Sequence, residues 1–316
     1  MTANTRWRRS LGALLLPVLL LTACTAKSPQ TPKPAIKPPV STSTQTTYPL
    51  TVTDDAGRSV TLAAEPKRVV SVAPSNTEML FALGKGDLLV GRSDFDDYPP
   101  EATKLPSIGG YVPPNYEAIM GAQPDLVLVI GGSVAERDKL ANEYKLPVLV
   151  LDPKTLNDVY KDLALLGQVV NAQPAATKLV DQMKADVAAV VTKVAGKPKP
   201  TVFYEVWHDP LMTAGQETFI NDLITLAGGV NIGADVKGWT NYSLEQVQAK
   251  DPDLYITSKE AVASVGQRSG FGGLKAIKAK KVFGMDDPNL GVRPGPRLIL
   301  GLQWFAKTIH PELFPG

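Results

Sequence analysis

Residues 174–194 read PAATKLVDQMKADVAAVVTKV, and this stretch organises the rest of the chain. Its apolar residues recur every three or four positions, which predicts an α-helix with one apolar face. Pro174 suits the first helical turn, and Gly196 with the run KPKP at 197–200 ends the helix. About 20 residues would form a rod of roughly 30 Å. Because the same kind of α/β unit lies on both sides of it, we predict that this helix connects two lobes.

The segments on either side of this helix alternate between strands and helices. After a hairpin at 48–62, strands are expected at 68–73, 88–91, 126–130, 148–151, 201–206, 254–257 and 282–285. Helices are expected at 75–83 (capped by Ser75 or Asn76), 135–144, 155–170, 219–226 and 298–309. Such strands, which lack strong in/out alternation, are typical of a mostly parallel sheet covered on both faces. The sequence therefore predicts an α/β fold with two Rossmann-like lobes, 50–155 and 198–316, joined by connecting helices at 156–197 that include the spanning helix 174–195.

Residues 1–24 are typical of a lipoprotein signal. A basic start precedes an apolar run at 11–21, and Leu21-Thr22-Ala23-Cys24 matches a lipobox. The alternative is a transmembrane helix with a chance cysteine, but the apolar run is short for a bilayer. We expect Cys24 to be lipidated and to hold the protein on the outer side of the cytoplasmic membrane. The Pro/Thr/Ser-rich residues 25–49 are expected to form a disordered tether.

Composition excludes several classes of function. The chain has 33 basic and 31 acidic residues, and removal of the signal with its three arginines would leave 30 basic residues. This balance disfavours nucleic-acid binding, which needs a concentrated basic surface. A single cysteine excludes an internal disulfide, and only two histidines disfavour a bare zinc or manganese site. We therefore expect no metal site.

Two segments, 115–126 (NYEAIMGAQPDL) and 243–254 (SLEQVQAKDPDL), resemble each other. They share Glu, Pro, Asp and Leu at the same offsets, which favours an internal duplication, although any two α/β segments could agree by chance. In a duplicated protein Glu117 and Glu245 would be equivalent. They could stabilise helix N-termini or dock a symmetric basic partner.

Motifs for catalysis are missing, but aromatic residues gather in predicted loops. The chain has no phosphate loop and no Gly-x-Ser-x-Gly elbow, which argues against an enzyme, with a secreted hydrolase as the remote alternative. The aromatic segments are 95–100, 109–114, 207–210 and 237–242, and the polar segment 289–293 precedes the last helix. Loops at the carboxyl ends of strands form the ligand crevice of α/β sheets. The pattern favours a cleft for a large, flat ligand, while core roles for Trp207 and Trp239 stay open.

Several motifs in order resemble the class III substrate-binding proteins of ABC importers, which handle cobalamin, ferric siderophores and haem. The resemblance covers about 68–316 and depends on RVVSVAPSNTE at 68–78, DYPP at 97–100, TAG at 213–215, AGGVNI at 227–232 and RPGPR at 293–297, together with the two Glu segments. It implies a monomeric receptor with a rigid cleft between two lobes, no catalytic activity and no cofactor. It also implies that Glu117 and Glu245 pair with arginines of a permease, which works with its ATPase.

Within this family the cobalamin-binding members are the most similar. The resemblance implies a corrin site lined by Ser75, Phe95, Tyr98, Tyr111, Trp207, Trp239, Asn289 and Arg293. Phe95 stands where those members have tyrosine, Tyr111 and Ile130 replace tryptophans, and Asn289 replaces an acid. The alternative is a ferric-siderophore or haem receptor. A siderophore would use Arg92 and Arg293, and haem would use Tyr98, Tyr111 or His208 as an axial ligand. His208 could also coordinate cobalt or be an ordinary loop histidine.

Overall fold

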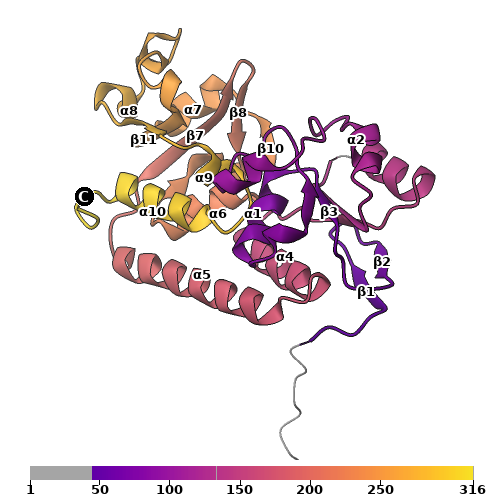
Figure 1. The fold of residues 1–316 in the computed structure, drawn as a ribbon. Helices are drawn as coiled ribbons and strands as arrows, with labels where there is room; N and C mark the ends of the chain where they lie inside the picture. Colours follow the sequence, from indigo (N-terminus) through magenta and orange to yellow (C-terminus); the bar gives the residue numbers. More distant parts are fainter. Residues whose placement is uncertain (1–44, 133, 316) are drawn as a thin grey trace, which may run out of the picture. The chain divides into compact units, whose positions relative to one another are not determined.

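The computed structural model describes residues 45–132 and 134–315, which belong to one compact unit. The predicted signal, Cys24 and most of the predicted tether lie outside these residues. Within them, no helix is both long and apolar enough to cross a membrane. The unit opens with the predicted hairpin, β1 (Leu50–Thr53) and β2 (Ser59–Leu62), which pair antiparallel (Figure 1). The Asp54 carboxylate accepts the amides of Ala56 and Arg58 and so shapes the turn.

The first sheet has four parallel strands in the order β4-β3-β5-β6. These are β3 (Val69–Ser71), β4 (Leu89–Gly91), β5 (Leu126–Val129) and β6 (Val148–Val150). The helices between them are α1 (Pro74–Ala82), α2 (Tyr116–Gly121) and α3 (Val134–Asp138), which continues as a π-helical turn, Lys139–Glu143. The prediction of a cap at Ser75 or Asn76 was wrong. Ala73 is the cap, and Pro74 starts the helix, because proline needs no partner for a missing N–H.

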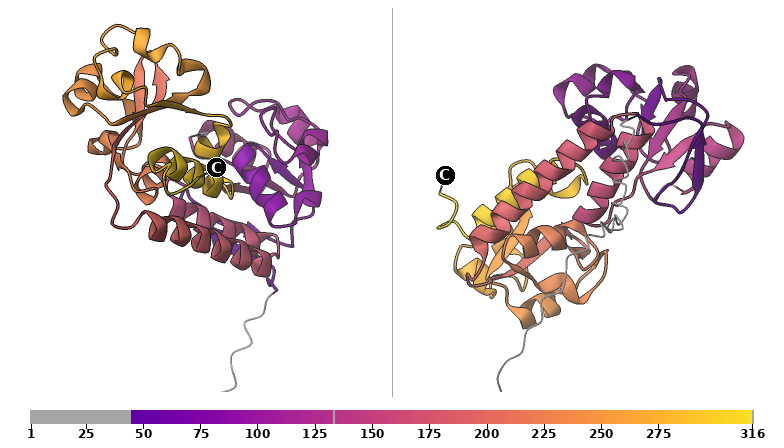
Figure 2. Two further views of the ribbon diagram at one scale, coloured as in Figure 1. Left: turned by 90° about the vertical axis from the view of Figure 1, so that its left-hand side faces the viewer. Right: turned by 90° about the horizontal axis from the view of Figure 1, so that it is seen from below.

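Three helices pack against one another, and the first two of them connect this sheet to the second one along the chain. They are α4 (Leu156–Val169), α5 (Gln173–Val194) and α10 (Leu298–Ile309), and α5 confirms the helix predicted from its apolar periodicity. Thr155 and Asp158 form a reciprocal capping box at the start of α4. Ala176, Val180, Met183 and Val190 of α5 are buried in the same core cluster as α4 and α10. Figures 1 and 2 show α5 lying alongside α10.

The second sheet contains four parallel strands in the order β9-β7-β11-β12. They are β7 (Thr201–His208), β9 (Val230–Asn231), β11 (Leu254–Ser258) and β12 (Val282–Met285). The remaining helices are α6 (Phe219–Leu226), α7 (Leu244–Lys250), α8 (Lys275–Lys278) and α9 (Asn289–Val292). Taken in chain order, these strands occupy the same places as the strands of the first sheet.

An antiparallel pair extends the second sheet and corrects two predicted loops, 207–210 and 237–242. β8 (Leu211–Ala214) pairs with β7, and β10 (Trp239–Asn241) pairs with β8. Trp207 and Trp239 therefore lie on strands, and Asn289 lies on the short helix α9. Single short strands carry little periodic signal, so a segment of three residues could not be told from a loop.

The two repeated segments have the same local structure. The side chains of Asn115 and Ser243 cap α2 and α7 by accepting a backbone amide three residues ahead. The carboxylate of Asp125 accepts the amides of Lys67 and Arg68 before β3, and Asp253 accepts the amide of Thr201 at the start of β7. This shared function explains why the Pro-Asp pair recurs at one spacing.

Candidate ligand-binding site

An aromatic pair follows β4 of the first sheet. The ring centroids of Phe95 and Tyr111 lie 4.7 Å apart, and 51 % of the Phe95 surface is exposed. The buried carboxyl of Asp96 anchors this loop, since the hydroxyls of Thr77 and Ser93 donate to it, and burial raises its pKa. Burial, with the charge of Asp96, also raises the pKa of Tyr111 to about 12. The pair thus presents an apolar, uncharged surface.

Arg293 holds this loop from the segment before α10. Its Nη1 lies 2.5 Å from Asp97 and 3.2 Å from Glu78, and its Nη2 donates to the Phe95 carbonyl at 3.1 Å. The Arg293 guanidinium lowers the pKa of Asp97 by donating to that carboxylate. Arg297 completes the cluster with bonds of 2.8 and 2.7 Å to the buried Glu78. Arg293 therefore positions the backbone of Phe95.

The structure does not group every predicted residue with this pair. The Tyr98 ring lies 4.1 Å from the Arg297 guanidinium and lines a separate cavity of about 460 Å³ together with residues of α5 and α10. Ser75 is buried within α1, with 2 % of its surface exposed. Asn289 is half-buried on α9, and its backbone N–H donates to the Asp287 carboxylate. Phe95, Tyr111 and Arg293 are the predicted residues that the structure brings together.

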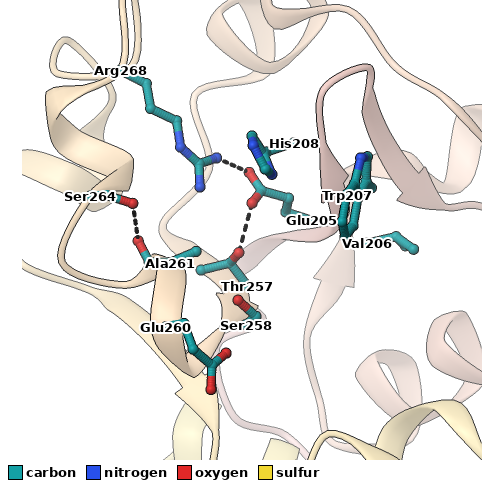
Figure 3. Close-up of a pocket in the computed structure, with 10 residues that line it drawn as sticks. All are labelled: Glu205, Val206, Trp207, His208, Thr257, Ser258, Glu260, Ala261, Ser264 and Arg268. Carbon is teal, nitrogen blue, oxygen red and sulfur yellow. Dashed lines mark hydrogen bonds and ion pairs between the residues drawn. The ribbon is translucent and has the colours of Figure 1, made fainter.

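A second group of predicted residues lines a pocket at the carboxyl ends of β7 and β11 (Figure 3). The pocket has a volume of about 360 Å³, within the range of small-molecule sites. Trp207 and His208 lie on its β7 side with ring centroids 5.4 Å apart, and Trp207 is 57 % exposed. The Trp207 Nε1 donates to the Asp209 carbonyl, which fixes the ring over the turn. The pocket thus has one large aromatic wall.

Glu205 lies at the base of this pocket and is buried. Its carboxylate accepts from the Thr257 hydroxyl at 2.7 Å, from Arg268 Nη1 at 2.6 Å, and from the Tyr255 hydroxyl. A buried carboxylate needs such partners because its desolvation is costly. Glu205 and Arg268 were not predicted from the sequence. The available signal was a charged residue inside the apolar strand VFYEVW at 202–207.

Trp239 belongs to neither group. It lies on the edge strand β10, where it pairs with Ala214 of β8. Its ring lies 5.3 Å from that of Phe219, the first residue of α6. It is 39 % exposed, so the structure makes it neither a core residue nor a member of the pocket in Figure 3.

Comparison with known families identifies the scaffold. The model of a family described as periplasmic binding protein matches residues 69–288. The chain belongs to the periplasmic binding protein family. It is 33 % identical over 312 residues to the ABC transporter substrate-binding lipoprotein YvrC of Bacillus subtilis, which covers 96 % of this chain and 97 % of that relative. This periplasmic binding protein is accordingly a substrate-binding component of an ABC transporter, and such proteins are not enzymes.

Further relatives of this periplasmic binding protein differ in ligand. A vitamin B12-binding protein of Pectobacterium carotovorum is 32 % identical over 260 residues, 80 % of this chain and 91 % of that relative. The solved vitamin B12-binding protein BtuF of Vibrio cholerae has a TM-score of 0.69 and 26 % identity, covering 79 % of this chain and 99 % of that one. A possible iron-binding protein of Staphylococcus epidermidis has a TM-score of 0.70 and 29 % identity, covering 78 % and 100 %.

The two predicted docking residues of this periplasmic binding protein lie on its surface. Glu117 and Glu245 are both exposed, each in the first turn of a short helix, α2 or α7. Neither forms an ion pair within the residues that the structure describes. Their helices precede β5 and β11, which hold equivalent places in the two sheets. The pair is therefore free to meet a partner, and its docking role stays a prediction.

Proposed function

We propose that the protein is a lipid-anchored receptor that binds cobalamin or a related corrinoid outside the cytoplasmic membrane and delivers it to an ABC permease with its ATPase. The similarity to vitamin B12-binding proteins carries this proposal, at 32 % identity over 80 % of the chain. Cys24 would bear the anchor, as the lipoprotein name of the Bacillus relative supports.

The exposed aromatic groups fit this ligand. The corrin macrocycle is large and flat, and its faces are suited to burial against aromatic rings. Phe95 with Tyr111 after β4 and Trp207 at the end of β7 offer such rings on both sheets. Arg293 contributes by ordering the Phe95 loop rather than through free donors, since two acids and a carbonyl already engage it.

A ferric-siderophore or haem receptor is the second candidate, supported by the similarity to the possible iron-binding protein of Staphylococcus epidermidis. Two observations rank it below cobalamin. A trianionic siderophore needs several arginines whose charge is not compensated, whereas Arg92 donates to the carbonyls of Ser93 and Thr103, and Arg293 and Arg268 are ion-paired. An iron-binding tyrosine must lose its proton, and the raised pKa of Tyr111 opposes this.

Calorimetric titration of residues 25–316 with cyanocobalamin tests the proposal. We expect one-to-one, submicromolar binding, weakened by Phe95→Ala because the substitution removes part of the aromatic surface. Absence of heat and of any spectral change would reject cobalamin as the ligand. Titration of the same protein with ferric siderophores and haem would then test the second candidate.

A further inference from the structure

We infer that the pocket in Figure 3 receives a carboxamide group of the ligand and discriminates against a carboxylate in the same place. The inference rests on the proposed function, because corrinoids carry carboxamide side chains around the macrocycle, whereas haem carries propionates.

The base of the pocket holds a neutral ion pair. Both oxygens of Glu205 are engaged by protein donors, with Arg268 Nη1 on Oε2 and Thr257 on Oε1. Only 3 % of the Glu205 side chain is exposed, and the guanidinium of Arg268 compensates its charge within the protein. Glu205 therefore holds the Arg268 guanidinium in place through Nη1, and the other guanidinium nitrogens can contact the ligand.

Arg268 keeps donor capacity for that ligand. Its side chain is 19 % exposed, and Glu205 is its one hydrogen-bond acceptor within 45–132 and 134–315. Figure 3 shows the second terminal nitrogen of the guanidinium directed into the space between Glu205 and Ala261. The Arg268 guanidinium also lies over the Phe271 ring at 5.7 Å, which supports its orientation. An incoming oxygen acceptor could bond this nitrogen.

The remaining charge in the pocket is negative. Glu260 lines the pocket and forms no ion pair in the described part of the chain, and Figure 3 shows its carboxylate on the far side of Thr257 from Arg268. Since Glu205 and Arg268 compensate each other, Glu260 is the carboxylate without an ion-pair partner among the described residues that line the pocket. The negative charge of Glu260 disfavours a carboxylate in the same pocket.

A carboxamide satisfies both ends of this arrangement. Its oxygen can accept from Arg268, and its NH₂ can donate to the Ser258 hydroxyl or to Glu260, which all line the same pocket. A carboxylate could accept from Arg268 and from the Ser258 hydroxyl, but it has no proton to donate to Glu260 and adds a second negative charge. Complementary polar groups of this kind decide specificity more than affinity.

The test compares cyanocobalamin with its monocarboxylic acids, in each of which one peripheral amide is hydrolysed. Binding is measured by calorimetry at low ionic strength, where charge effects are largest. The readout is the ratio of the Kd of each acid to the Kd of cyanocobalamin. One isomer carries its acid in place of the amide that enters the pocket. For this isomer we expect the ratio of the two Kd values to be about three or more, by analogy with the size of charge effects between partly exposed groups.

Glu260→Gln is the decisive variant, since an exposed side chain can be replaced without loss of the fold. It should bring that ratio toward one, because the repelling charge is gone. Glu143→Gln is the matched control. Glu143 is exposed on the π-helical turn before β6, does not line the pocket, and should leave the ratio as in the wild type.

The outcomes separate the inference from the proposed function. If cyanocobalamin binds but no acid isomer shows a raised ratio, or if Glu260→Gln leaves the ratio unchanged, the inference is overturned and the corrinoid receptor stands. If cyanocobalamin does not bind at all, both are overturned. A ratio that rises for one isomer and collapses in Glu260→Gln, but not in Glu143→Gln, supports the inference.

Discussion

Asp162 lies on α4 with 1 % of its surface exposed, an unusual place for an acid. Burial, reinforced by the charges of Asp55, Asp158 and Asp152, raises its pKa to about 9. Its neutral form is therefore the native form at neutral pH. In the unfolded chain an aspartate has a pKa of about 3.9 and is ionised. The native state thus binds more protons than the unfolded state between these values, and stability falls as the pH rises through that window.

Asp162→Asn should remove this dependence, because asparagine has no proton to lose. We expect the free energy of unfolding at pH 8 to rise by at least about 1 kcal/mol and its decline between about pH 5 and 9 to flatten. Urea unfolding at several pH values measures both. Asp181→Asn, on the exposed side of α5, is the control and should keep the wild-type slope. An unchanged slope in Asp162→Asn would show that Asp162 is not the titrating group.

At the scale of elements, the crossing of α4 and α5 depends on close approach. A Cβ added at Gly167 of α4 would lie 2.5 Å from the Cβ of Ala176 on α5. No flexible side chain could yield there, so the helices themselves would have to move apart. The glycine is therefore required by packing, although it lowers the helix propensity of α4.

Gly167→Ala should lower the free energy of unfolding by about 1–3 kcal/mol, as overpacking does in a close-packed core. Gly121→Ala is its counterpart in α2, where an added Cβ meets nothing within 4 Å. That variant should be neutral or more stable by up to about 1 kcal/mol. Urea unfolding of both proteins measures the difference. If both substitutions changed the free energy of unfolding equally, the contact between α4 and α5 would not explain the loss in Gly167→Ala.

At the scale of the whole described unit, one ionic cluster ties its two sheets together. Glu78 on α1, in the first sheet's half, receives Arg293 and Arg297 from the segment before α10. These side chains are 2 %, 12 % and 11 % exposed, so the pairing is shielded from water. Breaking such a buried pair leaves charge without compensation.

Glu78→Ala should therefore lower the free energy of unfolding by about 3 kcal/mol, and Glu78→Gln by less, because glutamine keeps an acceptor oxygen. Asp97→Asn is the comparison, since Asp97 meets the same Arg293 but is 60 % exposed and should cost less than about 1 kcal/mol. Urea unfolding at pH 7 ranks the three variants. If Asp97→Asn cost as much as Glu78→Ala, burial would not explain the effect.

Docking also belongs to this scale, because it needs two equivalent surface points. Glu117→Lys combined with Glu245→Lys should abolish stimulation of the permease ATPase and leave the affinity for cyanocobalamin intact, since both residues are exposed on α2 and α7. Reconstituted transporter assays and calorimetry provide the two measurements. Loss of ligand affinity instead would place these residues in ligand binding.

Much of the candidate site was predictable from residues that lie close together in the chain. The aromatic segments after strands, including Phe95, Tyr111 and Trp207, could be named because loops after parallel strands form crevices. The contacts of Arg293 within the protein could not be predicted in this way. Its donors meet Glu78 and Asp97, which lie 215 and 196 residues away along the chain. Such a pairing leaves no periodic signal.

The sequence by itself determined the alternation of strands and helices, the spanning helix α5 and the repeated Glu/Pro-Asp segments, because apolar periodicity, caps and turn residues act within a few positions. Only the tertiary structure decided that β8 and β10 join the second sheet and that Glu205 meets Arg268, 63 residues away. A buried charge finds its partner through the packing of distant segments, since desolvation must be compensated wherever the fold places the group.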